Sequence, residues 1–347
     1  MSKDPIRHIQ SHTSLRGIAA AFVVFGHYTA VFGRDVAGMD FYRPHTHLGV
    51  DLFFLLSGFV LAYVYKDTFS TGVSAGSWGQ FMIRRLARIY PLHIATLIIV
   101  LSYAHFTLAP GTANVLAMNI GLVHAWGLTD QFLFNSPSWS ISCEFAAYLV
   151  FPFLMLVMQS FWGRIALLGM AFGSYGLLWS FGAGSLDLDA IGRTHALWRA
   201  VAAFPLGMLL AWAHLQSDGP RGVWQLLGLA GLIGAIVIGL PEITWMPFLA
   251  LLVFATAHDD GPLAPMLRQP AFVGLGEVSY GVYLLQWPVM VLMFKIRPKL
   301  GLDGVALEIA ALGIFLGLLF VCSLVSYKCF EQPILQLFRR KTQKIAH

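Results

Sequence analysis

The stretch His47-Leu-Gly-Val-Asp51-Leu-Phe-Phe-Leu-Leu-Ser57-Gly-Phe59 decides the fold class of this protein. It opens a nearly uniform apolar window over residues 48–66, and about 20 such residues in a helix cross a lipid bilayer. Asp51 and Ser57 interrupt the window. The stretch therefore predicts a membrane-spanning helix that carries a carboxylate at a depth where charge is unfavourable.

The composition of the whole chain also indicates a protein embedded in a lipid bilayer. Of its 347 residues, 57% are hydrophobic and 11% are charged, whereas soluble domains carry about 25% charged residues. We predict an all-α integral membrane protein of about ten transmembrane helices, with windows at residues 15–33, 48–66, 86–108, 138–158, 164–181, 196–215, 222–240, 244–257, 278–295 and 304–328. Another window, 111–128, is less apolar and is compatible with a span, a re-entrant segment or an interfacial helix.

The distribution of Lys and Arg predicts the orientation, because cytoplasmic loops are enriched in both. If window 111–128 does not span and the N-terminus is cytoplasmic, 15 of the 22 basic residues lie on the inside; if it spans, 12 do. We therefore expect both termini in the cytoplasm, with a cytoplasmic segment at 1–14, one transmembrane domain at 15–333 and a basic tail at 334–347. Topology also explains the net charge of +5, so no nucleic-acid partner is expected.

Three ionisable side chains fall inside predicted spans in the outer part of the membrane. His27 lies near mid-membrane on the first helix, Asp51 lies about 5 Å below the outer end of the second, and Glu144 lies about 9 Å below that of the fourth. An imidazole and two carboxylates at overlapping depths predict a general base with an orienting partner. An ion pair, a proton relay, a packing histidine and a helix cap at Asp51 remain alternatives.

A cluster of arginines is predicted on the opposite, cytoplasmic side. Arg84, Arg85 and Arg88 open the third span, and Arg16 opens the first. Four guanidinium groups there could hold phosphates. The alternative is ordinary anchoring by positive charge at the cytoplasmic face.

Six short motifs occur in order over residues 14–333. They are Ser14-Leu15-Arg16-Gly17 with Gly26-His27, Gly49-Val50-Asp51-Leu52-Phe53-Phe54 with Ser57-Gly58-Phe59, Arg88-Ile89-Tyr90-Pro91, Trp139-Ser140 with Glu144, Ser279-Tyr280-Gly281, and Glu331-Gln332-Pro333. The ordered set resembles acyltransferase family three, integral-membrane enzymes that O-acylate envelope and secreted carbohydrates of bacteria. There are two departures. Thr13 and Ser14 replace an acidic residue and a glycine, and Gln286 stands where many members have His, so we assign Gln286 no catalytic role.

The resemblance implies a multi-pass O-acyltransferase of the bacterial inner membrane. It would move an acyl group, most often acetyl, from cytoplasmic acyl-CoA to a carbohydrate or glycolipid hydroxyl at the outer face, without a metal. The implied roles are His27 as general base with Asp51 or Glu144 orienting it, Ser57 and Trp139 lining the acceptor, and the four arginines holding CoA. An acyl-enzyme on His27 or Ser57 is a variant mechanism, and a proton-coupled transporter or flippase is the alternative function.

Overall fold

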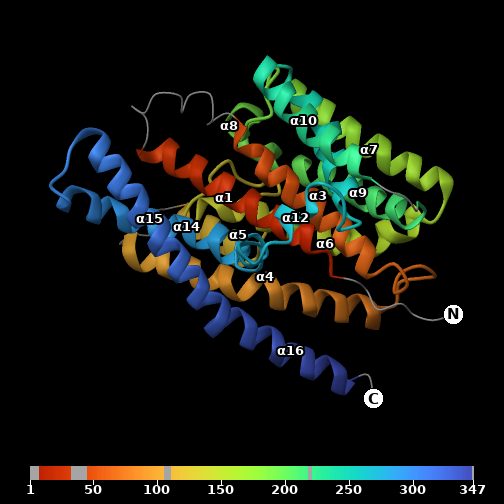
Figure 1. Ribbon diagram of the computed structural model, residues 1–347. Coiled ribbons are helices and arrows are strands. Elements are labelled where there is room, and N and C mark those ends of the chain that lie inside the picture. The colour runs from red at the N-terminus through yellow and green to blue at the C-terminus, as the bar shows by residue number, and fades with distance from the viewer. Residues whose placement is uncertain (1–7, 33–44, 105–110, 218–220, 346–347) are drawn as a thin grey trace. The chain divides into compact units, whose positions relative to one another are not determined.

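A computed structural model describes residues 8–32, 45–104, 111–217 and 221–345, and these residues form helices and loops without a strand (Figure 1). The longer helices are α1 (Gln10–Phe32), α3 (His47–Val64), α4 (Ala75–Ala104), α5 (Thr112–Ile120), α6 (Trp139–Met158), α7 (Phe161–Phe181), α9 (Ala196–Leu215), α10 (Gly222–Ile238), α11 (Trp245–Thr256), α13 (Pro270–Glu277), α14 (Ser279–Ile296), α15 (Gly304–Ser326) and α16 (Gln332–Ile345). Short turns are η2 (Ser136–Ser138), α8 (Leu188–Ile191), η3 (Arg193–His195), η4 (Glu242–Thr244), α12 (Ala264–Leu267), η5 (Arg297–Lys299) and the π-helical η6 (Tyr327–Glu331).

The all-helical multi-pass prediction is confirmed in outline. Each of the ten predicted windows coincides with a helix, and seven helical segments of the described chain are long and apolar enough to cross a membrane. Helices α10 and α11 are apolar but shorter. The number ten, the orientation and the domain limits stay predictions. Parts of those predictions, at residues 1–7, 33–44, 105–110, 218–220 and 346–347, lie outside the described residues.

The uncertain window 111–128 folds as the nine-residue helix α5 and a loop. At 1.5 Å per residue a helix of nine residues is only about 14 Å long, less than half the hydrocarbon thickness. This length argues against a complete crossing. It favours the interpretation in which the window is re-entrant or interfacial.

The chain divides into two compact units, and the division falls within α1 and within α6. The described parts of 1–19, 47–73 and 150–277 form the first unit, and those of 20–46, 74–149 and 278–347 form the second. His27, Glu144, Trp139 and the arginines of α4 belong to the second unit. Asp51, Ser57 and Arg16 belong to the first.

In the first unit, α3 packs side by side with α9, and two glycines bring the backbones into contact. A Cβ on Gly58 would lie 2.0 Å from the Phe204 carbonyl oxygen, and one on Gly207 would lie 2.0 Å from the Leu55 oxygen. Asp51, near the start of α3, pairs with Arg199, near the start of α9. The two helices are therefore parallel, which requires an odd number of crossings between them. Helices α4, α6 and α7 supply three if α5 does not cross.

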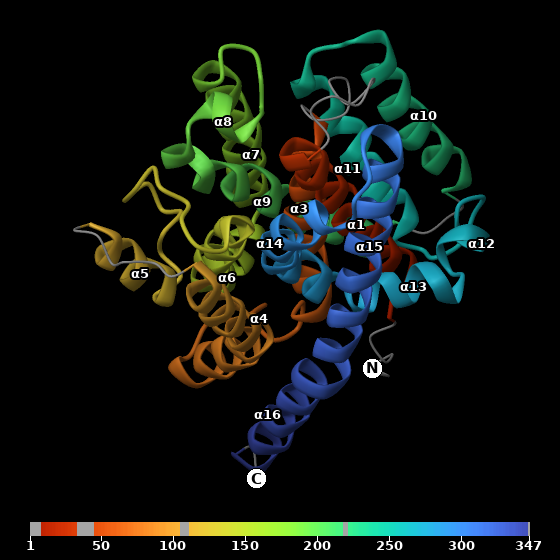
Figure 2. The same cartoon turned by 90° about the vertical axis from the view of Figure 1, so that its left-hand side faces the viewer.

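In the second unit, α14 packs against α4 and α15 (Figure 2). Pro288 lies inside α14 and has no N–H to donate to the carbonyl of Leu284, four residues earlier. The Asn135 side-chain amide donates to that carbonyl instead, at 3.1 Å, and also to Thr96 Oγ1 of α4 at 2.9 Å. The carbonyl that Pro288 leaves without its helical hydrogen bond is thus the point at which Asn135, in the loop before η2, links α4 to α14.

Candidate active site

His27 is held by Gln286. The half-buried imidazole of α1 places Nδ1 2.9 Å from Oε1 of Gln286, whose side chain on α14 is buried. The Gln286 amide nitrogen donates to the Tyr283 carbonyl at 2.7 Å, so the amide oxygen must face the ring. An oxygen accepts only from a protonated ring nitrogen. The arrangement therefore selects the tautomer with hydrogen on Nδ1, and in the neutral ring it leaves the lone pair of Nε2 as the basic position.

Three serines, Ser138 at the end of η2 and Ser140 and Ser142 in the first turn of α6, hold the start of α6 in the second unit. Ser138 Oγ lies 3.2 Å from Nε2 of His124, and Ser140 Oγ donates to the Tyr283 hydroxyl at 2.9 Å. Ser142 Oγ donates to the Leu122 carbonyl at 2.7 Å and accepts from the Ala125 amide at 3.2 Å. Leu122 lies in the 121–135 loop and has φ 56°, an uncommon left-handed conformation that the hydrogen bond from Ser142 stabilises. The serines position α6 against α14 and the 121–135 loop.

Trp139 and Glu144 lie in the first turns of α6, so the contacts of the serines also position these two side chains. Glu144 is half-buried, accepts from the Tyr148 hydroxyl at 2.5 Å, and interacts electrostatically with the phenols of Tyr280 and Tyr283 on α14. Trp139 is buried and stacks on Phe132 with ring centroids 6.2 Å apart. His27 and Glu144 are therefore both tied to α14, the former through Gln286 and the latter through the tyrosines.

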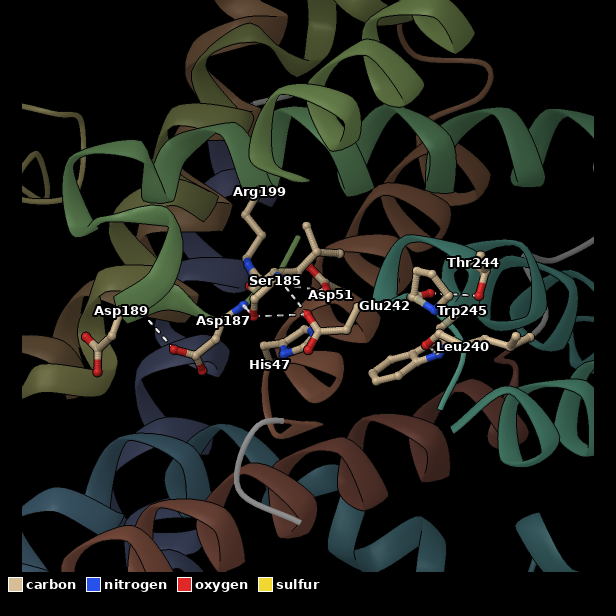
Figure 3. Close-up of polar contacts among 12 residues, drawn as sticks. His47, Asp51, Ser185, Asp187, Asp189, Arg199, Leu240, Glu242, Thr244 and Trp245 are labelled. Atoms are coloured by element: carbon tan, nitrogen blue, oxygen red, sulfur yellow. Dashed lines mark hydrogen bonds and ion pairs between the residues drawn. The ribbon is translucent and has the colours of Figure 1, made fainter. Parts of the chain in front are cut away.

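Asp51 has a different immediate environment in the first unit. Its carboxylate is 3.7 Å from Nη2 of Arg199, and the side chains are 0% and 1% exposed (Figure 3). Arg199 also donates to the Leu186 carbonyl. An Arg199 partner was not predicted. The sequence does place Arg199 inside the apolar window 196–215, which is unusual for an arginine. The topology prediction counted it as one of the outer basic residues, so no partner was sought for it.

Three of the four arginines predicted to hold phosphates lie on α4. Positions 84, 85 and 88 fall within about 100° of one another around a helix, so they share a face. Arg84 is exposed, Arg85 lies over the Phe81 ring at 5.8 Å, and Arg88 lies over the Tyr280 ring at 5.8 Å. The Tyr280 hydroxyl donates to the Ile89 carbonyl, which fixes that ring beside Arg88. Arg16 belongs to the first unit, so its membership of the cluster stays a prediction.

The carboxylate of Glu331 also acts on Arg88. Glu331 ends the π-helical turn η6, is buried, interacts electrostatically with Arg88 and accepts from Ser326 Oγ at 3.1 Å. A Cβ on Gly281 would approach Glu331 Oε1 to 3.2 Å, so the glycine leaves room for the carboxylate. Two of the late motifs thus meet at one of the predicted phosphate-binding arginines.

No group of three or more His, Cys, Asp or Glu side chains suited to a metal ion occurs in the described part of the chain. A family model described as the acyltransferase domain matches residues 12–328, nearly the whole chain. The chain belongs to this acyltransferase family. The enzyme predicted from the motifs is thereby confirmed at the level of acyl transfer, and the charged residues of its apolar helices belong to an acyltransferase of several membrane-spanning helices.

Similarity to named proteins agrees with the family. The acyltransferase is 32% identical over 321 residues to "Acyltransferase MdmB" of Streptomyces mycarofaciens, covering 81% of this chain and 79% of the relative. It is 24% identical over 333 residues to a protein named "Putative O-acetyltransferase" from Staphylococcus aureus strain COL, covering 82% of this chain and 52% of that relative. No solved structure gives a significant match.

Proposed function

We propose that this acyltransferase moves an acetyl group from cytoplasmic acetyl-CoA to a hydroxyl of a surface or exported carbohydrate, as a multi-pass protein of the bacterial inner membrane. The observation that supports this best is the His27–Gln286 hydrogen bond, with Nδ1 2.9 Å from the amide oxygen. It presents Nε2 as a base on a helix that otherwise consists mostly of apolar residues. Such a base is what O-acyl transfer requires.

In the proposed reaction, Nε2 of His27 removes the proton of the acceptor hydroxyl as its oxygen attacks the thioester carbonyl carbon. The carbon–sulfur bond then breaks, the acetyl group stays on the acceptor oxygen, and the CoA sulfur leaves with the proton held by His27. Gln286 stabilises the protonated ring through Nδ1 and keeps its orientation throughout. Glu144 contributes negative charge beside α14, which favours the imidazolium that forms transiently.

Arg84, Arg85 and Arg88 are proposed to hold the phosphates of CoA, with Arg16 as a further contributor. Bidentate guanidinium groups suit phosphate oxygens, and three of them share one face of α4. Helix α4 has 30 residues, about 45 Å, so it is longer than the hydrocarbon layer. We propose that its first turns, which carry these arginines, extend beyond that layer on the cytoplasmic side. Trp139 and Ser57 are proposed to line the acceptor path.

The test is transfer from radiolabelled acetyl-CoA in inside-out membrane vesicles that contain native envelope glycans. We expect His27→Ala to lower label in glycan at least 100-fold, because the base is lost. His195→Ala is the matched control, since its imidazole lies 2.7 Å from the nearby Ile191 carbonyl and stacks on Phe181, away from the residues proposed for the reaction. Full transfer by folded His27→Ala protein would contradict the proposal, and absence of transfer by wild type would favour transport.

The role of Gln286 is tested by comparing two substitutions of similar size. Gln286→Leu removes the oxygen that accepts from Nδ1, whereas Gln286→Glu keeps an acceptor oxygen there. As a positioning residue, Gln286 should give a large loss of kcat in the leucine variant, with the acetyl-CoA KM little changed, and substantial recovery in the glutamate variant. Equal activity of both variants would show that Gln286 only packs.

A further inference from the structure

The buried polar group around Asp51 in the first unit includes Arg199 and Tyr175, two residues that the proposed reaction does not use. Asp51 (α3), Arg199 (α9) and Tyr175 (α7) are 0%, 1% and 2% exposed. The Tyr175 hydroxyl interacts electrostatically with both Asp51 and Arg199. Three helices therefore bring an anion, a cation and a phenol together at one buried place, within the first two turns of α3 and α9.

Asp51 and Arg199 attract each other, but the three side chains keep hydrogen-bonding atoms that no described residue satisfies. Within the described part of the chain, both Asp51 carboxylate oxygens, Nε and Nη1 of Arg199 and the Tyr175 hydroxyl have no hydrogen-bond partner. The Asp51–Arg199 separation of 3.7 Å exceeds the 2.7–2.9 Å typical of a charge-assisted hydrogen bond. Buried polar atoms are rarely left in this state, because each has lost its water without replacement. The arrangement is complementary to a polar ligand.

The chemistry of the free atoms restricts that ligand. Asp51 needs donors, Arg199 needs acceptors, and the Tyr175 hydroxyl can serve as either. Asp51 and Arg199 together carry no net charge, so an ionic ligand would bring an uncompensated charge into this buried place, whereas a neutral one would not. A hydroxyl both donates and accepts, so two neighbouring hydroxyls on a neutral molecule satisfy the carboxylate and the guanidinium together.

Segment 185–187, in the connection between α7 and α8, contacts this buried polar group through Arg199. Arg199 Nη2 donates to the Leu186 carbonyl, while the Leu186 amide donates to Glu242 Oε2 at the start of η4 (Figure 3). Ser185 Oγ lies 3.4 Å from the same Glu242 oxygen, and His47 Nε2 lies 3.7 Å from it. The preceding turn has two left-handed residues, Ala183 at φ 49° and Gly184 at φ 97°. Segment 185–187 is therefore held by polar contacts that a competing polar ligand can replace.

We propose that Asp51, Tyr175 and Arg199 form a subsite for the hydroxyl groups of a neutral carbohydrate, entered when segment 185–187 releases Arg199. This proposal rests on the proposed function, because the molecule bound in the subsite would be the acceptor of the acetyl group. It specifies that this acceptor is neutral and rich in hydroxyl groups. The competing account is a structural ion pair that joins α3 to α9 and binds nothing.

The two accounts differ for a variant that removes both charges. Replacing a buried ion pair with apolar residues of similar size is often neutral or stabilising, so Asp51→Leu combined with Arg199→Met should fold. The matched control is Asp189→Leu with Arg193→Met, which removes an exposed pair a few residues away. The probe is tritiated n-octyl β-D-glucoside, whose sugar carries neighbouring hydroxyls and whose chain keeps it in the bilayer.

Binding is measured to purified protein in phosphatidylcholine nanodiscs, with empty nanodiscs as blank. We expect saturable binding to wild type and control, insensitive to 1-octanol, and at least tenfold weaker binding to the double variant at an unchanged melting temperature. Binding by the double variant within twofold of wild type, or no saturable binding by wild type, would overturn the subsite.

A smaller change covers the case in which the double variant does not fold. Tyr175→Phe removes one hydroxyl, and we expect binding at least threefold weaker; unchanged binding would overturn the assignment. The proposed function is read separately, as acetyl transfer from acetyl-CoA to the bound glycoside by wild type and His27→Ala. Glycoside binding without transfer by wild type would count against the transfer reaction while leaving the subsite intact.

Discussion

The first unit holds two arginine–aspartate pairs whose arginines, Arg193 and Arg199, lie near each other in the sequence but whose surroundings differ. Arg193 and Asp189 are four residues apart in the chain and 3.2 Å from each other, with side chains 42% and 77% exposed. Arg199 and Asp51 come from different helices, 3.7 Å apart, and are 1% and 0% exposed. The exposed Arg193–Asp189 pair is solvated by water and contributes little to stability, whereas the side chains of the Arg199–Asp51 pair are removed from water. Burial, not distance, decides which pair matters.

Breaking the buried pair on one side should have the largest effect. Arg199→Met alone leaves the Asp51 carboxylate buried without a counter-charge, which destabilises proteins by about 3–5 kcal/mol. We expect a strongly reduced yield of folded protein and a lower melting temperature in detergent. Adding Asp51→Leu should recover most of the loss. A single variant as stable as wild type would remove the contrast between the two pairs.

Separating the helices that carry the buried pair should have the next largest effect. Gly207→Ala places a Cβ 2.0 Å from the Leu55 carbonyl oxygen, so α9 must move away from α3 at a cost of about 1–3 kcal/mol. Gly169→Ala, in α7, has no atom within 4 Å of the added carbon and serves as control. Thermal melting of the two variants side by side measures the difference. Equal melting temperatures would mean that this close approach is not required.

Loosening the segment over the buried pair should have a smaller effect on stability. Glu242→Gln weakens the hydrogen bond from the Leu186 amide, worth about 1.5–3 kcal/mol when the acceptor is charged. We expect faster hydrogen exchange in peptides covering residues 182–187, with global melting nearly unchanged. Exchange at the wild-type rate would show that Glu242 does not hold the segment.

Removing the exposed pair should have the smallest effect. Arg193→Ala should change the free energy of unfolding by about 0.5 kcal/mol or less, because a solvated pair gains little. Raising the salt to 1 M should abolish even that difference while leaving the effect of Arg199→Met intact, since buried pairs are screened much less. A loss comparable with that of Arg199→Met would contradict the role given to burial.

Most of the helical architecture could be predicted from the sequence alone. Window 48–66 is a helix because its backbone has no other way to satisfy its hydrogen bonds in lipid. The same argument holds for the other windows, and the ordered motifs were enough to indicate the acyltransferase family. His27, Asp51 and Glu144 were recognisable as unusual for the same reason, since ionisable groups in apolar helices need a partner or a function.

The identity of each partner was decided by tertiary structure. His27 and Asp51 lie in different units, so the site that they were predicted to share stays a prediction; within the units, the His27 ring contacts Gln286, 259 residues away, and Asp51 pairs with Arg199. Gln286 was given no catalytic role because it stands where the resemblance leads us to expect a histidine, and Arg199 was counted as an ordinary outer cation. Helix formation depends on neighbours in the chain, whereas a partner depends on which helix faces come together. In this protein Gly58, Gly207 and Pro288 shape those helix contacts.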